Sequence, residues 1–171
     1  MHEHGVVLRN LEASGILMTE TNDPENAVPR ISRIDRATIG GIGQMTIGAF
    51  GDVRYCSPEV VMGKRYNHKS DVWSFGVILF LITTKKYPFE ADGKSSYSDG
   101  SLSLNSDNVE EYNKVIIKEV EDKIINYKPN LREMKDLGIS NLLLDLMRLI
   151  FKKDPKARPS ISEVLQHQWF K

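Results

Sequence analysis

Residues 70–84 read SDVWSFGVILFLITT, and when this run is wound into a helix it is apolar on nearly every face. A helix that is hydrophobic all round belongs at the centre of a core, because a surface helix needs a polar face toward water. The longest uninterrupted apolar run, residues 76–82, is too short to cross a bilayer, which takes about 20 apolar residues. We therefore expect one buried central helix with the rest of the chain packed around it.

The composition of the chain is that of a soluble globular domain. Its 171 residues are 40% hydrophobic and 27% charged, and 23 basic residues balance 23 acidic ones. A net charge of zero argues against a nucleic-acid or acidic-membrane binder, which usually carries an excess of basic residues. The single cysteine, Cys56, excludes an internal disulfide and favours a reducing compartment. The N-terminus lacks the basic and apolar segments of a secretory signal, so we expect a cytoplasmic location.

Short strands are expected near the N-terminus, where small apolar or alternating runs stand between polar loops. The candidate strands are residues 6–7, 16–18 and 30–34. The run TIGGIGQMTIGAFG, residues 38–51, is rich in glycine and shows no helical period. We expect it to be flexible.

Helical patterns dominate the remainder of the chain. Helices are expected at residues 70–84, 109–125, 141–151 and 160–170. The last of these begins with a capping box, in which Ser160 is followed three residues later by Glu163. The serine-rich run DGKSSYSDGSLSLNSDN, residues 92–108, is expected to be a disordered insertion. The predicted fold class is mostly α with a small N-terminal β-hairpin region.

Four segments, taken in order, resemble the C-terminal lobe of a eukaryotic protein kinase of the serine/threonine type. The segment HEHGVVLRNLEASGIL (2–17) is similar to the catalytic loop H-R-D-L-K-x-x-N, and RYCSPEVV (54–61) is similar to the A-P-E end of the activation segment. The segment SDVWSFGVILFLITTKKYPF (70–89) is similar to the long central helix, and DPKARPSISEVLQHQWF (154–170) is similar to the arginine loop and last helix. Any one match is weak, but together they cover nearly the whole chain in the family's order. The resemblance implies one partial kinase-like domain over residues 1–171, with the family's N-terminal lobe absent.

The resemblance also places unsuitable residues at the catalytic positions. Asn10 stands where the family has the aspartate that accepts the substrate proton, and a neutral amide is no practical base. Glu12 replaces the lysine that meets the transferred phosphate, so negative charge would face negative charge. Gly15 replaces the asparagine that holds a magnesium ion, and glycine has no side chain to offer.

The magnesium-binding aspartate of the family's D-F-G motif aligns with Arg33, because residues 30–32 match the strand before it. In a second register, Asp35 is that aspartate and residues 35–37 form a degraded D-F-G. Even then one carboxylate lacks its asparagine partner, and magnesium needs several oxygen ligands in good geometry. We therefore expect no intact catalytic, cofactor-binding or metal site, and no cofactor.

Five residues match the family at architectural positions. The resemblance implies that Asp71, at the start of the central helix beside Trp73, accepts backbone amides from the catalytic loop. It also implies a buried ion pair between Glu59 and Arg158 that ties the activation segment to the last helices, the alternative being two exposed charges of little energetic weight. Arg9 corresponds to the arginine that clamps a phosphate on the activation segment, although we expect it to be solvated here.

Three hypotheses about function follow. The first is a catalytically impaired kinase-like C-lobe, or pseudokinase, that binds or regulates a protein. The alternative is a fragment of a serine/threonine kinase that binds ATP and magnesium and phosphorylates proteins once it is joined to a missing N-lobe. In the third, Met1 is an internal methionine of a longer kinase-like protein. Because the family's helix before the loop is missing, we expect Val72, Phe75, Ile78 or their neighbours to be uncovered, which favours a protein partner, self-association or the missing segment as cover.

Overall fold

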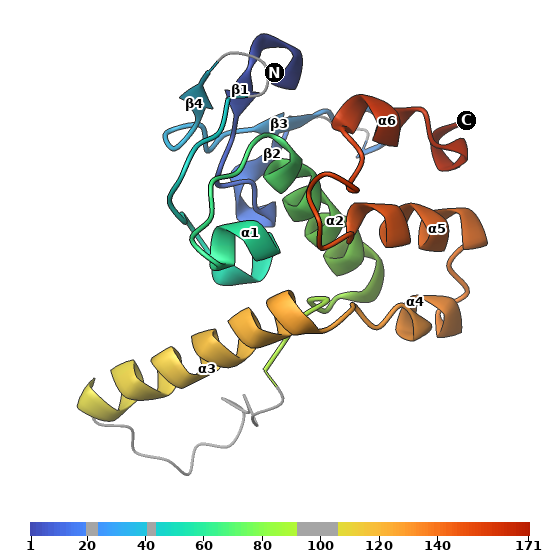
Figure 1. Ribbon diagram of the computed structural model, residues 1–171. Helices are drawn as coiled ribbons and strands as arrows, with labels where there is room; N and C mark the ends of the chain where they lie inside the picture. The colour runs from blue at the N-terminus through green and yellow to red at the C-terminus, as the bar shows by residue number, and fades with distance from the viewer. Residues whose placement is uncertain (20–23, 41–43, 92–105) are drawn as a thin grey trace.

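The computed structural model describes residues 1–19, 24–40, 44–91 and 106–171, which surround one central helix, α2 (Figure 1). The α-helices are α1 (Pro58–Val61), α2 (Lys69–Thr84), α3 (Ser106–Asn126), α4 (Arg132–Asp136), α5 (Asn141–Ile150) and α6 (Ile161–Leu165). The strands are β1 (Val6–Val7), β2 (Ile16–Met18), β3 (Pro29–Ile31) and β4 (Thr38–Ile39). Single 3-10 turns are formed by His2–His4, Ala13–Gly15, Pro24–Asn26, Val53–Tyr55 and Gln168–Phe170. The described residues are thus mainly helical with a small β region, which confirms the predicted fold class in outline.

Helix α2 is buried along most of its length, as its apolar sequence predicts. Trp73 is fully buried and stacks on Phe89 with ring centroids 5.7 Å apart, and it meets Phe151 edge-on at 5.0 Å. Gly76 brings α2 against α5, since a Cβ at that position would lie only 2.4 Å from the Ile150 methyl carbon Cγ2. The missing side chain at Gly76 therefore sets how closely the two helices approach.

The expectation that Val72 and Ile78 are uncovered is wrong. Val72 is fully buried and Ile78 is 6% exposed, and only Phe75 of the three is partly exposed. Leu11, Ala13 and Ile16 pack against the core cluster that contains Val72 and Ile78. Beside Val72 and Phe75 a hollow of about 240 Å³ remains, which Met1, Leu8, Leu11 and Ile161 also line.

The strands form two separate two-stranded sheets rather than one hairpin that joins residues 6–7 to residues 16–18. Strand β1 pairs antiparallel with β4, and β2 pairs antiparallel with β3. The stretch 38–51 was expected to be flexible, but Thr38–Ile39 forms β4 and Thr46 bridges Tyr66 through two backbone hydrogen bonds of 2.7 and 2.9 Å. That expectation is wrong where the stretch is described, because its partners lie far away in the sequence.

The predicted helix at residues 160–170 is two elements. Its start is as predicted, because the Ser160 hydroxyl accepts from the Glu163 amide at 3.3 Å and the Glu163 carboxylate accepts from the Ser160 amide at 2.6 Å. Helix α6 nevertheless ends at Leu165, and the His167 ring accepts from the Trp169 amide at 3.2 Å to begin a new turn.

The predicted insertion at 92–108 lies mostly outside the described residues, and α3 begins at Ser106, earlier than predicted. Among the helices that the structure describes, none has both the length and the apolar character to cross a membrane.

Candidate functional site

The loop that follows β1 is held to α2 through a single buried carboxylate. Asp71, 3% exposed, accepts hydrogen bonds from the backbone amides of Leu8 at 2.8 Å and Arg9 at 3.0 Å. The His2 ring nitrogen Nε2 lies 2.9 Å from the same carboxylate. These contacts have the geometry that the sequence implied for Asp71, and they fix the loop from its backbone. The His2 contact could not be inferred from the sequence.

Arg9 is partly exposed and makes specific contacts, so it is not the fully solvated arginine that was expected. It has a positive φ of 68°, and its guanidinium donates to the Ile47 carbonyl at 3.0 Å and to the Tyr66 hydroxyl at 3.2 Å. The guanidinium carbon also lies 4.1 Å from the centre of the Phe50 ring. Arg9 therefore binds the loop to the stretch that resembles an activation segment, through groups that carry no phosphate.

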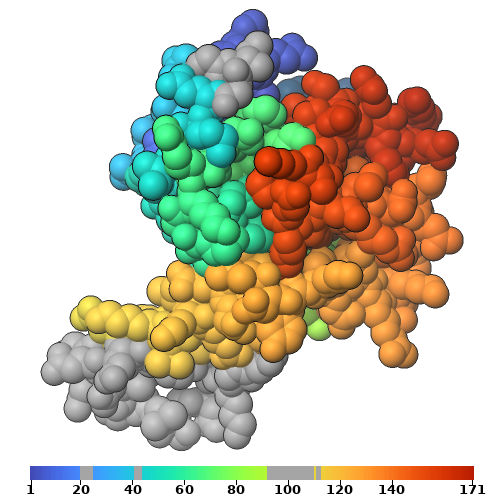
Figure 2. Space-filling model, in the orientation of Figure 1, coloured from blue at the N-terminus to red at the C-terminus, as the bar shows by residue number. Residues whose placement is uncertain are grey.

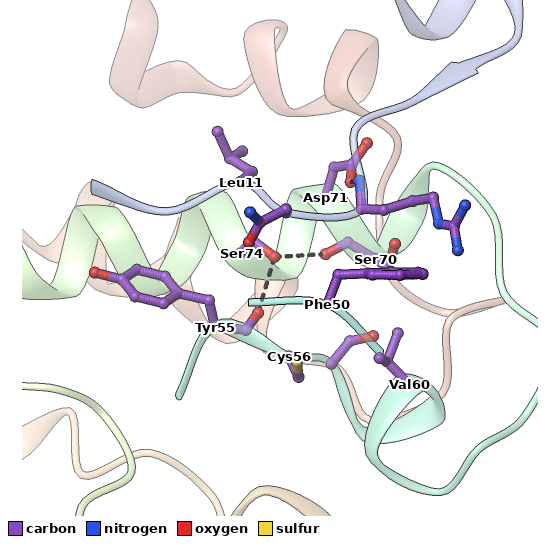
Figure 3. A pocket seen from close by; sticks show the side chains of 11 residues that line it. Leu11, Phe50, Tyr55, Cys56, Val60, Ser70, Asp71 and Ser74 are labelled. Atoms are coloured by element: carbon purple, nitrogen blue, oxygen red, sulfur yellow. Dashed lines mark hydrogen bonds between the residues drawn. The ribbon is translucent and has the colours of Figure 1, made fainter. Parts of the chain in front are cut away.

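Asn10 lies against Gly51, whose added Cβ would come within 1.9 Å of the Asn10 side-chain oxygen. Behind this contact the loop, residues 50–57 and the first turns of α2 enclose a space of only about 10 Å³, which is room for a single water. Figure 3 shows the Ser74 hydroxyl spanning this region, where it hydrogen-bonds the carbonyls of Tyr55 at 2.8 Å and Ser70 at 3.2 Å. The region beneath Asn10 is packed and leaves no room for a ligand.

Three of the sequence-predicted site residues meet at one point. The Arg33 guanidinium donates to the Glu12 carboxylate, whose side chain is 8% exposed. The aliphatic stem of Arg33 runs beside Gly15, where a Cβ would find its carbons at 3.3–3.4 Å. Ser14 donates a second hydrogen bond to Glu12 at 2.8 Å. Glu12 is therefore neutralised from within the chain, and the space at Gly15 is filled by arginine.

These residues do not fit a magnesium ion. Hard divalent cations need several oxygen ligands, whereas Gly15 provides no side-chain oxygen and Arg33 brings a positive charge to the same place. Asp35, the alternative ligand, is a 65% exposed side chain that pairs with Arg36 at 3.1 Å. Among the described residues there is no group of three His, Cys, Asp or Glu side chains that could hold a metal ion.

The Glu59–Arg158 ion pair links α1 to the segment before α6. Arg158 is fully buried, and its guanidinium nitrogens donate to the two Glu59 carboxylate oxygens at 2.7 and 2.9 Å. The same guanidinium donates to the Lys69 carbonyl at 2.8 Å and to the Lys152 carbonyl at 3.1 Å. The structure thus brings together the pair that the sequence suggested, and it places Arg158 at the junction of three segments.

Two nearby residues have local roles. Burial raises the pKa of Asp52, but the hydrogen bonds from Arg54 outweigh it and leave the pKa below its ordinary value. Asp52 thereby caps the turn Val53–Tyr55. Burial and the Asp52 carboxylate raise the pKa of the Cys56 thiol to about 12, so Cys56 is protonated at neutral pH and is not a reactive thiolate.

A loop held by a buried helix carboxylate, next to a buried Glu–Arg pair and an all-apolar central helix, is the framework of a kinase-type C-terminal lobe. Residues 1–170 match the family described as protein kinase domain. The chain belongs to the protein kinase family.

Its relatives are serine/threonine kinases. The chain is 25% identical to serine/threonine-protein kinase Nek4 of Mus musculus over 100% of its own length and 18% of that protein's. It is 28% identical to calcium-dependent protein kinase 2 of Zea mays over 99% of its length and 28% of the relative's. It is 33% identical to serine/threonine-protein kinase ppk16 of Schizosaccharomyces pombe over 71% of its length and 14% of the relative's. The chain thus spans less than a third of each of these proteins.

Proposed function

We propose that this chain is a kinase-like domain that does not transfer phosphoryl groups and acts by binding a protein. The observation that carries the proposal is the contact of Arg33 with Glu12 and Gly15. A kinase of this family places a lysine, an asparagine and an aspartate at these positions to handle phosphate and magnesium. Here a cation fills the place of the metal ligands, and a carboxylate stands where phosphate would approach.

The residue expected to accept the proton is also unsuited to that role. Asn10 is a neutral amide, and it is packed against Gly51 above a space of about 10 Å³. No rearrangement of the loop makes an amide a general base at neutral pH. The proposal therefore rests on two separate features, the base position and the metal position. We expect neither ATP nor magnesium to bind.

A cytoplasmic location of the protein remains a prediction.

Binding of a protein fits the surface of α3, which lies along the outside of the domain (Figure 2). Figure 1 shows α3 extending past the body of the domain at its N-terminal end. Val115 is 60% exposed and Ile117 is 44% exposed on this helix. Isolated exposed apolar residues are common, so these two support the proposal only together with the inactive site.

The test has two parts, both with the full chain. A thermal-shift measurement with millimolar ATP and magnesium is expected to show no stabilisation, because mass action raises stability only when a ligand binds the folded state. A radiolabelled-ATP assay with a general protein substrate is expected to show no transfer above the chelator-treated control. Stabilisation together with magnesium-dependent transfer would overturn the proposal and favour a kinase completed by an N-lobe.

A matched variant keeps the test specific to this site. In Arg33→Asp the guanidinium is removed and the carboxylate of the family pattern is restored. If ATP and magnesium raise the melting temperature equally in the wild type and in Arg33→Asp, the nucleotide binds away from residues 12–33. If they raise it only in the wild type, Arg33 is not an obstacle to nucleotide binding.

A further inference from the structure

A basic hollow lies beside the C-terminal end of α5. It has a volume of about 420 Å³ and is lined by Lys128, Pro129, Leu131, Arg148, Phe151, Lys152 and Lys153. Its walls come from the segment after α3, the end of α5 and the residues that follow it. No acidic residue lines this hollow among the residues that the structure describes.

The positive charge of the hollow is not balanced by ion pairs. Lys128, Arg148 and Lys152 are exposed, and none of them forms an ion pair with a described residue, although the chain as a whole carries no net charge. The carboxyl ends of α3 and α5 offer roughly half a negative charge each. Four basic side chains therefore face about one unit of negative charge, and a surplus remains.

Lys153 is the half-buried member of the four basic residues that line the hollow. Its amino group donates to the Ile124 carbonyl and lies 4.7 Å from the centre of the Phe89 ring and 5.1 Å from that of Trp73. Burial, and then the neighbouring Arg158, lower the pKa of Lys153 to about 8. The basic lining of the hollow attracts an anion and repels a further cation.

We propose that this hollow binds the acidic side chains of a protein partner. The basic walls select carboxylates, and the apolar residues Pro129, Leu131 and Phe151 favour an apolar side chain beside them. Its volume lies within the roughly 300–1,000 Å³ of ordinary ligand pockets. A concave site of this size does not follow a flat membrane surface, and it lacks the extended basic stripe of a nucleic-acid binder. The proposal rests on the proposed protein-binding function and names the chemistry of the partner.

The experiment uses the full chain and a fluorescent peptide with two glutamates on each side of a leucine. Fluorescence polarisation is expected to show saturable binding that weakens as salt is raised, because exposed charges are screened. The double variant Arg148→Glu/Lys152→Glu is expected to lose at least about tenfold in affinity. The same peptide with glutamines in place of the glutamates is expected not to bind.

The matched control is Lys135→Glu/Lys156→Glu, which changes the net charge equally on two exposed lysines outside the hollow. It is expected to bind the peptide as the wild type does. If the charge reversal lowers the melting temperature, the neutral double variant Arg148→Gln/Lys152→Gln replaces it, and a clear loss of affinity is still expected.

Four results would overturn the proposal. They are equal losses in the two reversal variants, binding of the glutamine peptide, no saturable binding at millimolar peptide, and binding only to phosphatidylserine vesicles with the same residue dependence. The radiolabelled-ATP assay on the same preparation separates the two proposals. Phosphoryl transfer would overturn the proposed function and leave the peptide result standing, whereas loss of peptide binding without transfer would overturn only this site.

Discussion

The Arg33 guanidinium contacts the buried Glu12 carboxylate. In the register that the resemblance implies for Arg33, the family has an aspartate and a lysine at these two positions, so both charges are opposite in sign to the family pattern. An exchange of this kind keeps an attraction between the two positions while it removes the groups that would hold metal and phosphate. The loop is held to the N-terminal end of α2 by the Asp71 carboxylate. A single substitution at either position would have left two like charges together.

Replacement of Arg33 by alanine is expected to lower the free energy of unfolding by about 1–2 kcal/mol, because Glu12 stays buried and retains only the Ser14 hydrogen bond. The effect stays below that of a fully buried pair because the Arg33 side chain is 51% exposed. Urea unfolding followed by circular dichroism measures it. Arg30→Ala, an exposed arginine in the same hairpin, is the control, and an equal loss in both variants would contradict the assignment.

Restoration of the family asparagine at Gly15 is expected to be harmful on its own. A side chain there meets the Arg33 stem at 3.3–3.4 Å, and overpacking of this kind typically costs about 1–3 kcal/mol. The double variant Gly15→Asn/Arg33→Asp removes the obstructing stem, but it also sets a carboxylate beside Glu12. In Gly15→Asn/Arg33→Ala the stem is removed without a new carboxylate. We therefore expect this double variant to lose less stability than the sum of the losses in the two single variants. A double-mutant cycle in thermal melting measures this coupling, and strict additivity would show that the two residues do not touch.

Loss of Glu59 is expected to destabilise the fold more than any loop substitution. Glu59→Ala leaves the fully buried Arg158 cation without its carboxylate, a change that typically costs about 3–5 kcal/mol. Glu59→Gln keeps the shape and a hydrogen-bond acceptor and should recover part of the loss. Chemical denaturation compares both with Glu3→Ala, which removes an exposed carboxylate. An unchanged midpoint for Glu59→Ala would refute the structural role of the pair.

The stability of the domain is expected to fall as the pH drops below neutrality, in part through His68. Burial, then the neighbouring His2 and Lys69, lower the pKa of His68 below its ordinary value, whereas Asp71 acts in the opposite direction. The unfolded chain therefore takes up the proton first, near about pH 6.5. The stability contributed by neutral His68 is present above that pH and is lost as the pH falls through the folded pKa.

This dependence is measured as the melting temperature between about pH 7.5 and pH 5.5. His68→Gln removes the titrating ring and is expected to flatten the profile, while His4→Gln, an exposed histidine, should leave its slope unchanged. A wild-type slope that persists in His68→Gln would assign the titration to another group.

The sequence predicted best those features that depend on local pattern. The apolar run at residues 70–84 specified a buried helix, and the Ser160–Glu163 spacing specified a helix start, because both signals lie within one element. The sequence did not predict three contacts whose partners lie far apart in the chain. They are the pairing of β1 with β4, the Thr46–Tyr66 bridge and the hydrogen bond from Arg9 to Tyr66. The helix end at Leu165 was missed because a His167 ring interaction, rather than glycine or proline, begins the next turn.

The sequence singled out the residues of the candidate site one by one but did not predict how they contact one another. The alignment identified four departures from the family pattern, at Asn10, Glu12, Gly15 and Arg33. Their mutual contact was not foreseen, because alignment places residues one by one and does not show that two reversed charges neutralise each other. The burial of Val72 and Ile78 was missed for a similar reason, since the N-terminal residues cover the face that was assumed to be bare.

Asp71 holds the loop through the amides of Leu8 and Arg9, which every residue except proline supplies whatever its side chain. The backbone conformation of the loop consequently depends on Asp71 of α2 more than on the side chains of the loop itself. Substitutions can accumulate along that stretch without collapse of its outline. The same backbone outline can therefore present very different sets of side chains at the surface.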